Sequence, residues 1–268
     1  MARVVAQRRP WLWLASAIVF VACAALAVAI WRNPNIDHRI VARYQFAPAI
    51  LHGLVVTVVL ALLSAAIGTT LGVAFALMRL SRSAVLRGFA AFYAWLFRGT
   101  PLLVQILFWG NLALLFQMLG PFRTNDVMTP FVASVVALGL NEGAYMSEIV
   151  RAGISAVDRG QYDAAQALGM SHALAMRRIV LPQALAVIVP PAGNQFISLL
   201  KATSLVSVIA GGDLLTAAEN ISSANLRTIE LMLVATFWYL VLTTLTSLGQ
   251  HLLEKRLARA GAGIHAAD

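Results

Sequence analysis

The chain has 268 residues, of which 60% are hydrophobic and 12% are charged, and its mean hydropathy is +0.80. This composition supplies too little polar surface to cover a soluble globule, so it excludes a soluble domain and indicates an integral membrane protein. The net charge of +9 comes from basic residues dispersed at the ends of apolar runs. That dispersal argues against nucleic acid as a partner and favours anionic membrane lipid.

Runs of about 20 apolar residues are long enough to cross a bilayer as helices. In chain order, the runs that reach this length cover residues 11–31, 49–78, 89–119, 130–150, 184–210 and 229–253. They predict an all-α integral membrane protein with about six transmembrane helices.

The runs divide the chain into three expected parts. Residues 1–47 hold an N-terminal tail, the first transmembrane helix and an outer loop, residues 48–257 hold a core of five helices, and residues 258–268 form a C-terminal tail. The first run also follows a basic segment and ends in small residues, as a secretory signal peptide does. Its length favours an uncleaved anchor. Cys23 is the only cysteine, so no disulfide can form within the chain.

The distribution of positive charge predicts the orientation in the membrane, because Lys and Arg in short loops stay on the cytoplasmic side. With the N-terminus inside, most of the 20 Lys and Arg residues fall in cytoplasmic segments. Both termini are therefore predicted to be cytoplasmic.

Motifs for catalysis are missing from the sequence. There is no phosphate-binding loop of the form G-x-x-x-x-G-K-[ST], no H-E-x-x-H and no arrangement typical of a Ser/His/Asp triad. The histidines show no metal-ligand spacing. The sequence thus predicts neither an enzyme nor a metal site, and no cofactor held by this chain.

A polar segment of about residues 157–182 lies between two apolar runs and predicts a helical hairpin outside the membrane. Its first part, to residue 168, is rich in helix formers with small side chains, and Gly169 is placed to provide a left-handed C-terminal cap. Ser171 can cap a second short helix that is expected to stop before Pro182. The hairpin either inserts into a groove of a partner protein or lies on the lipid headgroups.

This segment resembles the EAA motif of the membrane subunits of ATP-binding cassette (ABC) importers, which reads E-A-A-x3-G-x9-I-x-L-P. The leading carboxylate is Asp163 where the motif has glutamate. The matching or adjoining residues, which the resemblance assigns to contact with the ATPase, are Gly160, Gln161, Asp163, Ala164, Ala165, Ala167, Gly169, Ile179, Leu181 and Pro182.

Flanking segments make the chain similar to the polar amino acid uptake permeases, the branch that includes histidine, glutamine and arginine transporters. The resemblance covers about residues 48–257. It is carried by Phe97-Arg98-Gly99-Thr100-Pro101-Leu102 with Gln105, by Gly143-Ala144-Tyr145 with Glu148-Ile149, by Gly160-Gln161, by Leu181-Pro182-Gln183-Ala184 and by Lys201-Ala202-Thr203-Ser204-Leu205.

The resemblance implies a type I ABC importer permease in a bacterial inner membrane, multi-pass, translocating polar amino acids. It implies four kinds of partner: a cytoplasmic ABC ATPase that binds ATP and Mg, a periplasmic or lipid-anchored amino-acid-binding protein, a second copy or a homologous sister permease, and membrane lipid. ATP binding would close the ATPase pair and switch the permease from inward-facing to outward-facing.

Polar residues at membrane depth are costly and usually face a cavity or a partner, so they are the candidates for the substrate pathway. On the runs they are Asn141, Glu142, Tyr145, Glu148, Asn194, Gln195 and Lys201, and the family segments add Arg98 and Gln105.

Several of these candidates have a structural alternative. Glu142 could meet a charge of the translocated amino acid, whereas Glu148 could instead form an ion pair with Arg151 three residues on. Lys201 could line the cavity or serve helix packing, and Arg98 could belong to a gate or to a simple helix-entry turn.

The outer segment of residues 211–227 is short and polar. We expect it to help form the face that contacts the binding protein, with Asp213 and Glu219 among its charges; a solvated loop is the alternative.

Two other functions remain open from the sequence. One is an ion-coupled secondary carrier that needs no ATPase, although no inverted repeat is visible. The other is a non-transporting membrane scaffold whose hairpin recruits a soluble partner.

Overall fold

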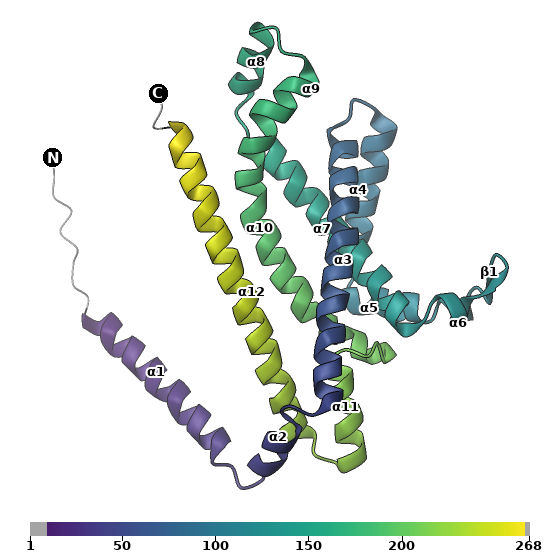
Figure 1. Ribbon diagram of the computed structural model, residues 1–268, viewed down its shortest axis with the longest axis vertical. Helices are drawn as coiled ribbons and strands as arrows, with labels where there is room; N and C mark the ends of the chain where they lie inside the picture. Colours follow the sequence, from purple (N-terminus) through teal and green to yellow (C-terminus); the bar gives the residue numbers. More distant parts are fainter. Residues whose placement is uncertain (1–9, 266–268) are drawn as a thin grey trace.

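The computed structural model describes residues 10–265, which are helical almost throughout (Figure 1). The expected cytoplasmic residues Arg3, Arg8 and Arg9 and the last residues of the C-terminal tail, 266–268, lie outside the described residues. The α-helices of eight residues or more are α1 (Pro10–Trp31), α3 (Pro48–Leu80), α4 (Ala84–Gly99), α5 (Leu102–Gly110), α7 (Pro130–Ser155), α8 (Arg159–Ala167), α10 (Leu181–Ala202), α11 (Leu214–Asn225) and α12 (Thr228–His265).

Shorter elements connect them. They are α2 (His38–Tyr44), the 3-10 turn η1 (Leu112–Leu114), the strands β1 (Met118–Leu119) and β2 (Phe122–Arg123), α6 (Thr124–Val127), α9 (His172–Ala175), the π-helix η2 (Met176–Val180) and the 3-10 helix η3 (Thr203–Ile209). The two strands form an antiparallel hairpin.

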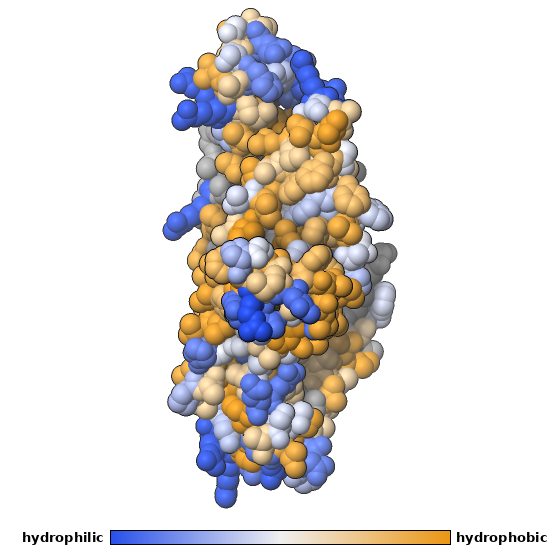
Figure 2. All heavy atoms as spheres, turned by 90° about the vertical axis from the view of Figure 1, so that its right-hand side faces the viewer, coloured by the Kyte–Doolittle hydropathy of each residue, from blue (hydrophilic) through white to orange (hydrophobic). Residues whose placement is uncertain are grey.

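The long helices run lengthwise through the molecule, with α8 and α9 at one end and α2 and α11 at the other (Figure 1). We call the end that carries α8 and α9 the hairpin end. Hydrophilic residues gather at both ends, and a mostly hydrophobic band lies between them (Figure 2). This distribution fits a bundle that crosses a bilayer with the hairpin in water.

Helix α7 lies at the centre of the bundle, where it packs against α3, α4, α5 and α10. Its closest neighbour is α3, because glycines on α3 let the two backbones approach each other. A Cβ atom at Gly68 would lie 2.6 Å from Glu142 Cβ, and one at Gly72 would lie 3.1 Å from the backbone nitrogen of Ser147. The enclosed position of α7 explains how this helix can carry charged residues at membrane depth.

We expect Gly72→Ala to destabilise the protein by about 1–3 kcal/mol, because the added methyl would meet the backbone of α7, which cannot move aside without shifting the helix. Gly88→Ala on α4 is the matched control, since a Cβ there meets nothing within 4 Å. Both changes carry the same helix-propensity gain of about 0.5–1 kcal/mol. Thermal unfolding in detergent should show a lower midpoint for Gly72→Ala alone; equal midpoints would contradict the close α3–α7 approach.

Among the described residues, fewer helices are long and apolar enough to cross a membrane than the six spans predicted. Within the described residues, the helical stretches long and apolar enough to cross a membrane are Pro48–Leu80, His172–Ile209 and Thr228–Arg256, or four if the bent pair α4 and α5 is one span. Helix α7 carries charged residues and does not meet this criterion, and α1 contributes only the shorter apolar stretch Ala15–Leu26. The expected count of six is therefore not confirmed.

The third predicted span, residues 89–119, is wrong as a single helix. It breaks between Gly99 and Leu102, where α4 and α5 meet at an angle of 98°. Pro101 stands at the break; it has no backbone N–H for the helical hydrogen bond and its ring disfavours a helical residue before it. The end of the predicted span is not helical either, since Met118–Leu119 forms the first strand of the hairpin.

The sequence predicts that the second helix of the polar segment stops before Pro182, and this prediction is wrong. The helix continues from α9 through η2 into α10 as one helical stretch. The backbone N–H of Leu181 reaches back to the carbonyl of Met176, five residues earlier, so the helix widens just before the proline. A π-helical turn of this kind accommodates Pro182 without ending the helix.

Candidate functional site

A cavity of about 500 Å³ lies beside the break between α4 and α5. Residues from the break, from α7 and from α10 line this cavity, which we call the central pocket. The polar side chains on it are those of Arg98, Thr100, Asn141, Glu142, Tyr145, Gln195 and Ser198. The structure thus brings together Arg98, Asn141, Glu142 and Tyr145 from the predicted pathway residues, and Gln195 with them.

The break is held open by two side-chain amides. In an uninterrupted helix the carbonyl of Phe97 would accept from the N–H of residue 101, which proline lacks. Instead, Gln105 Nε2 donates to Phe97 O at 2.9 Å and Asn141 Nδ2 donates to it at 2.8 Å. Gln105 also donates to Thr100 O and accepts from Asn141 at 3.2 Å. Gln105 and Asn141 therefore satisfy the carbonyl that Pro101 leaves free and fix the wall of the central pocket.

Glu142 is a carboxylate enclosed by the bundle, with 3% of its surface exposed. Gln195 Nε2 donates to its Oε2 at 3.0 Å across the pocket from α10. Among the described residues no basic side chain forms an ion pair with Glu142. A buried carboxylate with one amide partner has unused acceptor capacity, so this wall of the pocket favours a cationic group.

Arg98 provides the opposite charge on the same pocket. Its guanidinium lies over the ring of Tyr145, 5.4 Å from the ring centroid. Its Nη1 is also 4.0 Å from Glu148 Oε2, which lies outside the pocket lining. Arg98 thus stands between the central pocket and a group of charges nearer the hairpin end.

Glu148 is the centre of that group. It pairs with Arg151, as the spacing predicts, and with Arg79 of α3 at 2.8 Å. One carboxylate therefore ties α3, α4 and α7 together, and the structural interpretation of Glu148 is the one that the geometry supports. The sequence does not identify Arg79 as a partner of Glu148, because a basic residue at the end of a span indicates only orientation in the membrane.

The remaining pathway candidates lie elsewhere. Asn194 and Lys201 are exposed on α10 and are not among the residues that line the central pocket in the described part of the chain. Ser198 does line the pocket and was missed. Its position three residues after Gln195 on the same helix is the signal that could have identified it.

The hairpin formed by α8 and α9 is locked by capping interactions. Asp158 accepts from Gly160 N–H at 2.6 Å at the start of α8. At its end Gly169 has φ +77°, its N–H bonds Gln166 O at 2.9 Å, and Met170 N–H bonds Ala165 O at 3.0 Å. This pair of bonds is the Schellman motif, so the predicted left-handed cap is confirmed.

The second helix of the hairpin, α9, begins as predicted, because Ser171 Oγ accepts a hydrogen bond from Leu174 N–H. The Tyr162 hydroxyl also forms a hydrogen bond with the ring of His172, joining α8 to α9. Ala165 is buried within the hairpin, whereas its neighbours are exposed. Six of the residues predicted to contact the ATPase are exposed on α8 and the cap that follows it: Gly160, Gln161, Asp163, Ala164, Ala167 and Gly169.

The other predicted coupling residues, Ile179, Leu181 and Pro182, lie at the junction of η2 and α10. They connect the hairpin to a membrane helix directly. Because α9, η2 and α10 form one continuous helical stretch, a displacement of the hairpin can be transmitted along α10 to Gln195 on the central pocket.

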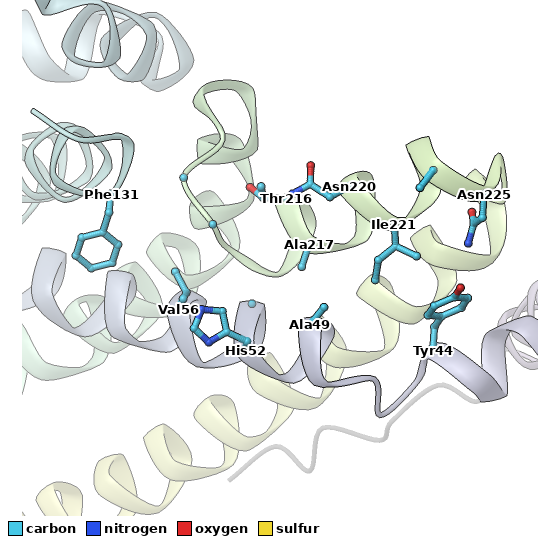
Figure 3. Close-up of a pocket in the computed structure, with 14 residues that line it drawn as sticks. Tyr44, Ala49, His52, Val56, Phe131, Thr216, Ala217, Asn220, Ile221 and Asn225 are labelled. Atoms are coloured by element: carbon cyan, nitrogen blue, oxygen red, sulfur yellow. The ribbon is translucent and has the colours of Figure 1, made fainter. Parts of the chain in front are cut away.

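A second cavity, of about 620 Å³, opens at the opposite end between α3 and α11. Its wall includes Tyr44, His52, Phe131, Thr216 and Asn220 (Figure 3). It contains none of the predicted pathway residues, and its lining is mostly apolar.

The expectation for residues 211–227 needs correction. The segment is mainly the helix α11 and not a loop. Asp213 is fully buried, because it caps α11 by accepting from the N–H groups of Leu215 and Thr216 and also accepts from the Tyr239 hydroxyl at 3.1 Å. It is therefore not a surface charge for a partner. Glu219 is partly exposed and remains available.

Comparisons with known proteins agree on one family. The model of the binding-protein-dependent transport system inner membrane component family matches residues 68–259. The chain is 40% identical over 258 residues to the arginine transport system permease protein ArgU of Corynebacterium glutamicum, covering 94% of this chain and 82% of the relative. It is also 40% identical over 216 residues to the L-cystine transport system permease protein TcyB of Bacillus subtilis, covering 80% and 89%.

Solved structures give the same picture. A crystal structure of an amino acid ABC transporter with histidines matches with a TM-score of 0.73 and 39% identity, covering 82% of this chain and 99% of that chain. An inward-facing structure of the MetNI methionine ABC transporter matches with a TM-score of 0.59 at 17% identity, covering 81% and 97%, and this likeness concerns the fold alone.

Proposed function

Because the chain belongs to the family of binding-protein-dependent transport system inner membrane components and is an amino acid ABC permease, we propose that the central pocket is its substrate site and the hairpin its contact with the ATPase. The observation that carries the proposal is the meeting of Arg98 and buried Glu142 on one pocket. An amino acid is a zwitterion, and this pocket offers a cation for its carboxylate and an anion for a positive group.

The pocket favours a substrate with a cationic side chain. Glu142 accepts one hydrogen bond, from Gln195, which orients the carboxylate, and it can accept further charge-assisted hydrogen bonds from a cationic group. The name of one relative, an arginine transport permease, supports the same class. Tyr145 would pack against the aliphatic part of such a substrate.

Energy for transport comes from outside this chain, whose sequence contains no nucleotide-binding loop. ATP and Mg would be held by a cytoplasmic partner ATPase docked on the exposed face of α8. Moving a two-state equilibrium from 1:99 to 99:1 takes about 5.5 kcal/mol of differential binding, and the closing ATPase pair would apply this through the hairpin to α10.

The proposal also fixes an orientation. The hairpin end would face the cytoplasm together with both termini, and the opposite end, with Glu219 on α11, would receive the periplasmic or lipid-anchored binding protein. The last described turns of α12 lie toward the hairpin end, which supports this assignment (Figure 1).

Reconstituted uptake tests the proposal. Proteoliposomes that hold this permease with its ATPase should take up arginine only when ATP is inside and the binding protein is outside. Uptake that follows an imposed proton or sodium gradient without ATP would instead establish a secondary carrier. Absence of any uptake, with the ATPase bound and folded, would establish a scaffold.

A further inference from the structure

Arg98 belongs both to the central pocket and to the group of charges around Glu148. It lines the pocket, where its guanidinium lies over the ring of Tyr145. Its Nη1 is also 4.0 Å from Glu148 Oε2. The same guanidinium can therefore face a carboxylate in the pocket or the carboxylate of Glu148, and its choice depends on how firmly Glu148 holds it.

Arg98 is the most weakly held of the three arginines around Glu148. Arg79 Nη1 donates to Glu148 Oε2 at 2.8 Å, Arg151 Nε donates to the same oxygen at 3.3 Å, and Arg151 Nη2 donates to Oε1. At 4.0 Å Arg98 makes a charge contact with Glu148 that is too long for a hydrogen bond. Its side chain is also the most exposed, at 40% against 27% for Arg79 and 31% for Arg151. Both carboxylate oxygens of Glu148 thus keep closer partners when Arg98 leaves.

These differences favour an exchange of Arg98 between two carboxylates. A partly exposed charge contact changes an equilibrium by only about two- to fivefold, so Arg98 loses little when it leaves Glu148. The carboxylate of an amino acid in the pocket would offer the direct, bidentate hydrogen bonds that Glu148 does not give to Arg98. Charge stays balanced, because Glu148 keeps Arg79 and Arg151 while the incoming carboxylate gains Arg98.

We propose that Glu148 is a positioning residue for transport, which competes with the carboxylate of the substrate for Arg98 and so sets the affinity of the central pocket. Transport requires a site that binds its substrate and also releases it, and this competition limits how tightly the carboxylate is held. The proposal rests on the function proposed above, because Arg98 acts on a substrate only if the central pocket holds an amino acid.

Two substitutions should change the affinity for arginine in opposite directions. Glu148→Gln removes the competing charge, so the Kd of arginine should fall about two- to fivefold. Arg79→Gln removes a close partner of Glu148, which then attracts Arg98 more strongly, so the Kd should rise by a similar factor. A purely structural ion pair would instead give changes of the same sign, because both substitutions break the same 2.8 Å contact between α3 and α7.

Equilibrium binding of radiolabelled arginine to the purified permease measures these changes, with thermal unfolding to show that each variant is folded. Arg79→Gln leaves Glu148 paired with Arg151, so it tests the proposal by itself if Glu148→Gln does not fold. Arg87→Gln is the matched control and should leave the Kd unchanged, because Arg87 donates to the backbone carbonyls of residues 81 and 82 and not to Glu148. Agmatine, which is arginine without its carboxylate, should not bind more tightly to Glu148→Gln.

An Arg98→Gln background separates an action through Arg98 from a general change in the electrostatic potential. In that background Glu148→Gln should no longer change the Kd of arginine. An undiminished change there, or changes of the same sign in Glu148→Gln and Arg79→Gln, would overturn the proposal and leave the function of the pocket standing. Arg98→Gln alone should raise the Kd at least about tenfold. An unchanged Kd in Arg98→Gln would refute the central pocket as the site of the carboxylate, and the role of Glu148 with it.

Discussion

Replacing Gly169 by valine is expected to remove the partner ATPase from the purified permease and to abolish ATP-driven uptake. Gly169 ends α8 with φ +77°, a conformation that a β-branched residue almost never adopts. A strain of about 2 kcal/mol in this region lowers the equilibrium constant between the intact and the distorted hairpin about 30-fold. The bonds from Gly169 and Met170 back to α8 would be lost with it.

Gly169→Asn is the matched control, because asparagine tolerates the left-handed conformation while filling the same exposed position. A Cβ atom at residue 169 meets nothing within 4 Å, so neither change creates a clash inside the permease. Affinity purification from membranes should recover the ATPase with Gly169→Asn and lose it with Gly169→Val. Equal recovery with both variants would show that the hairpin's geometry does not govern docking.

The hairpin was the part of the site best predicted from sequence, since its signals are local. Gly169 and Ser171 act on hydrogen bonds within a few residues, and both caps formed where the sequence placed them. The predicted end of the second hairpin helix, before Pro182, was wrong because its signal is local as well. Proline usually marks a boundary, but a π-helical turn absorbed Pro182, and nothing in the local pattern distinguishes the two cases.

The central pocket was predicted as a set of residue types and not as a set of neighbours. Intramembrane polarity indicated Glu142 and Gln195, which line the central pocket, yet it equally indicated Asn194 and Lys201, which the helix rotation of α10 turns away from the pocket. Rotation about a helix axis depends on packing with α7 and α12, which a uniformly apolar sequence leaves undetermined.

Asp213 is a residue whose burial the sequence could not predict. A charged residue in a short segment between spans usually faces water, but here the backbone of α11 needed an N-cap in the interior, and the carboxylate was buried to provide it. The burial of this carboxylate depends on where the start of α11 lies in the fold, because Tyr239 donates to Asp213 and Thr57 accepts from the neighbouring Leu214 N–H. Sequence spacing carries no information about which distant residues surround the start of α11.

Replacing Glu142 by glutamine is expected to lower arginine uptake about 10- to 100-fold, the equivalent of a charge-assisted hydrogen bond of about 1.5–3 kcal/mol. The change conserves shape and can still bond Gln195, so the wall of the central pocket keeps its form. Competition between arginine and glutamine for uptake in proteoliposomes gives the specificity directly. Uptake of glutamine should change by less than about threefold, because it has no cationic side chain to lose a partner.

Asn194→Ala is the control for this prediction, because Asn194 precedes Gln195 on α10 but is exposed and outside the pocket lining. It should leave both uptake rates within about twofold. An equal fall for arginine and glutamine in Glu142→Gln would mean that this carboxylate holds the ammonium group common to all amino acids, not the side chain. Unchanged uptake of both would remove Glu142 from the pathway, since a buried carboxylate that touches substrate cannot lose its charge without altering the affinity for a cation.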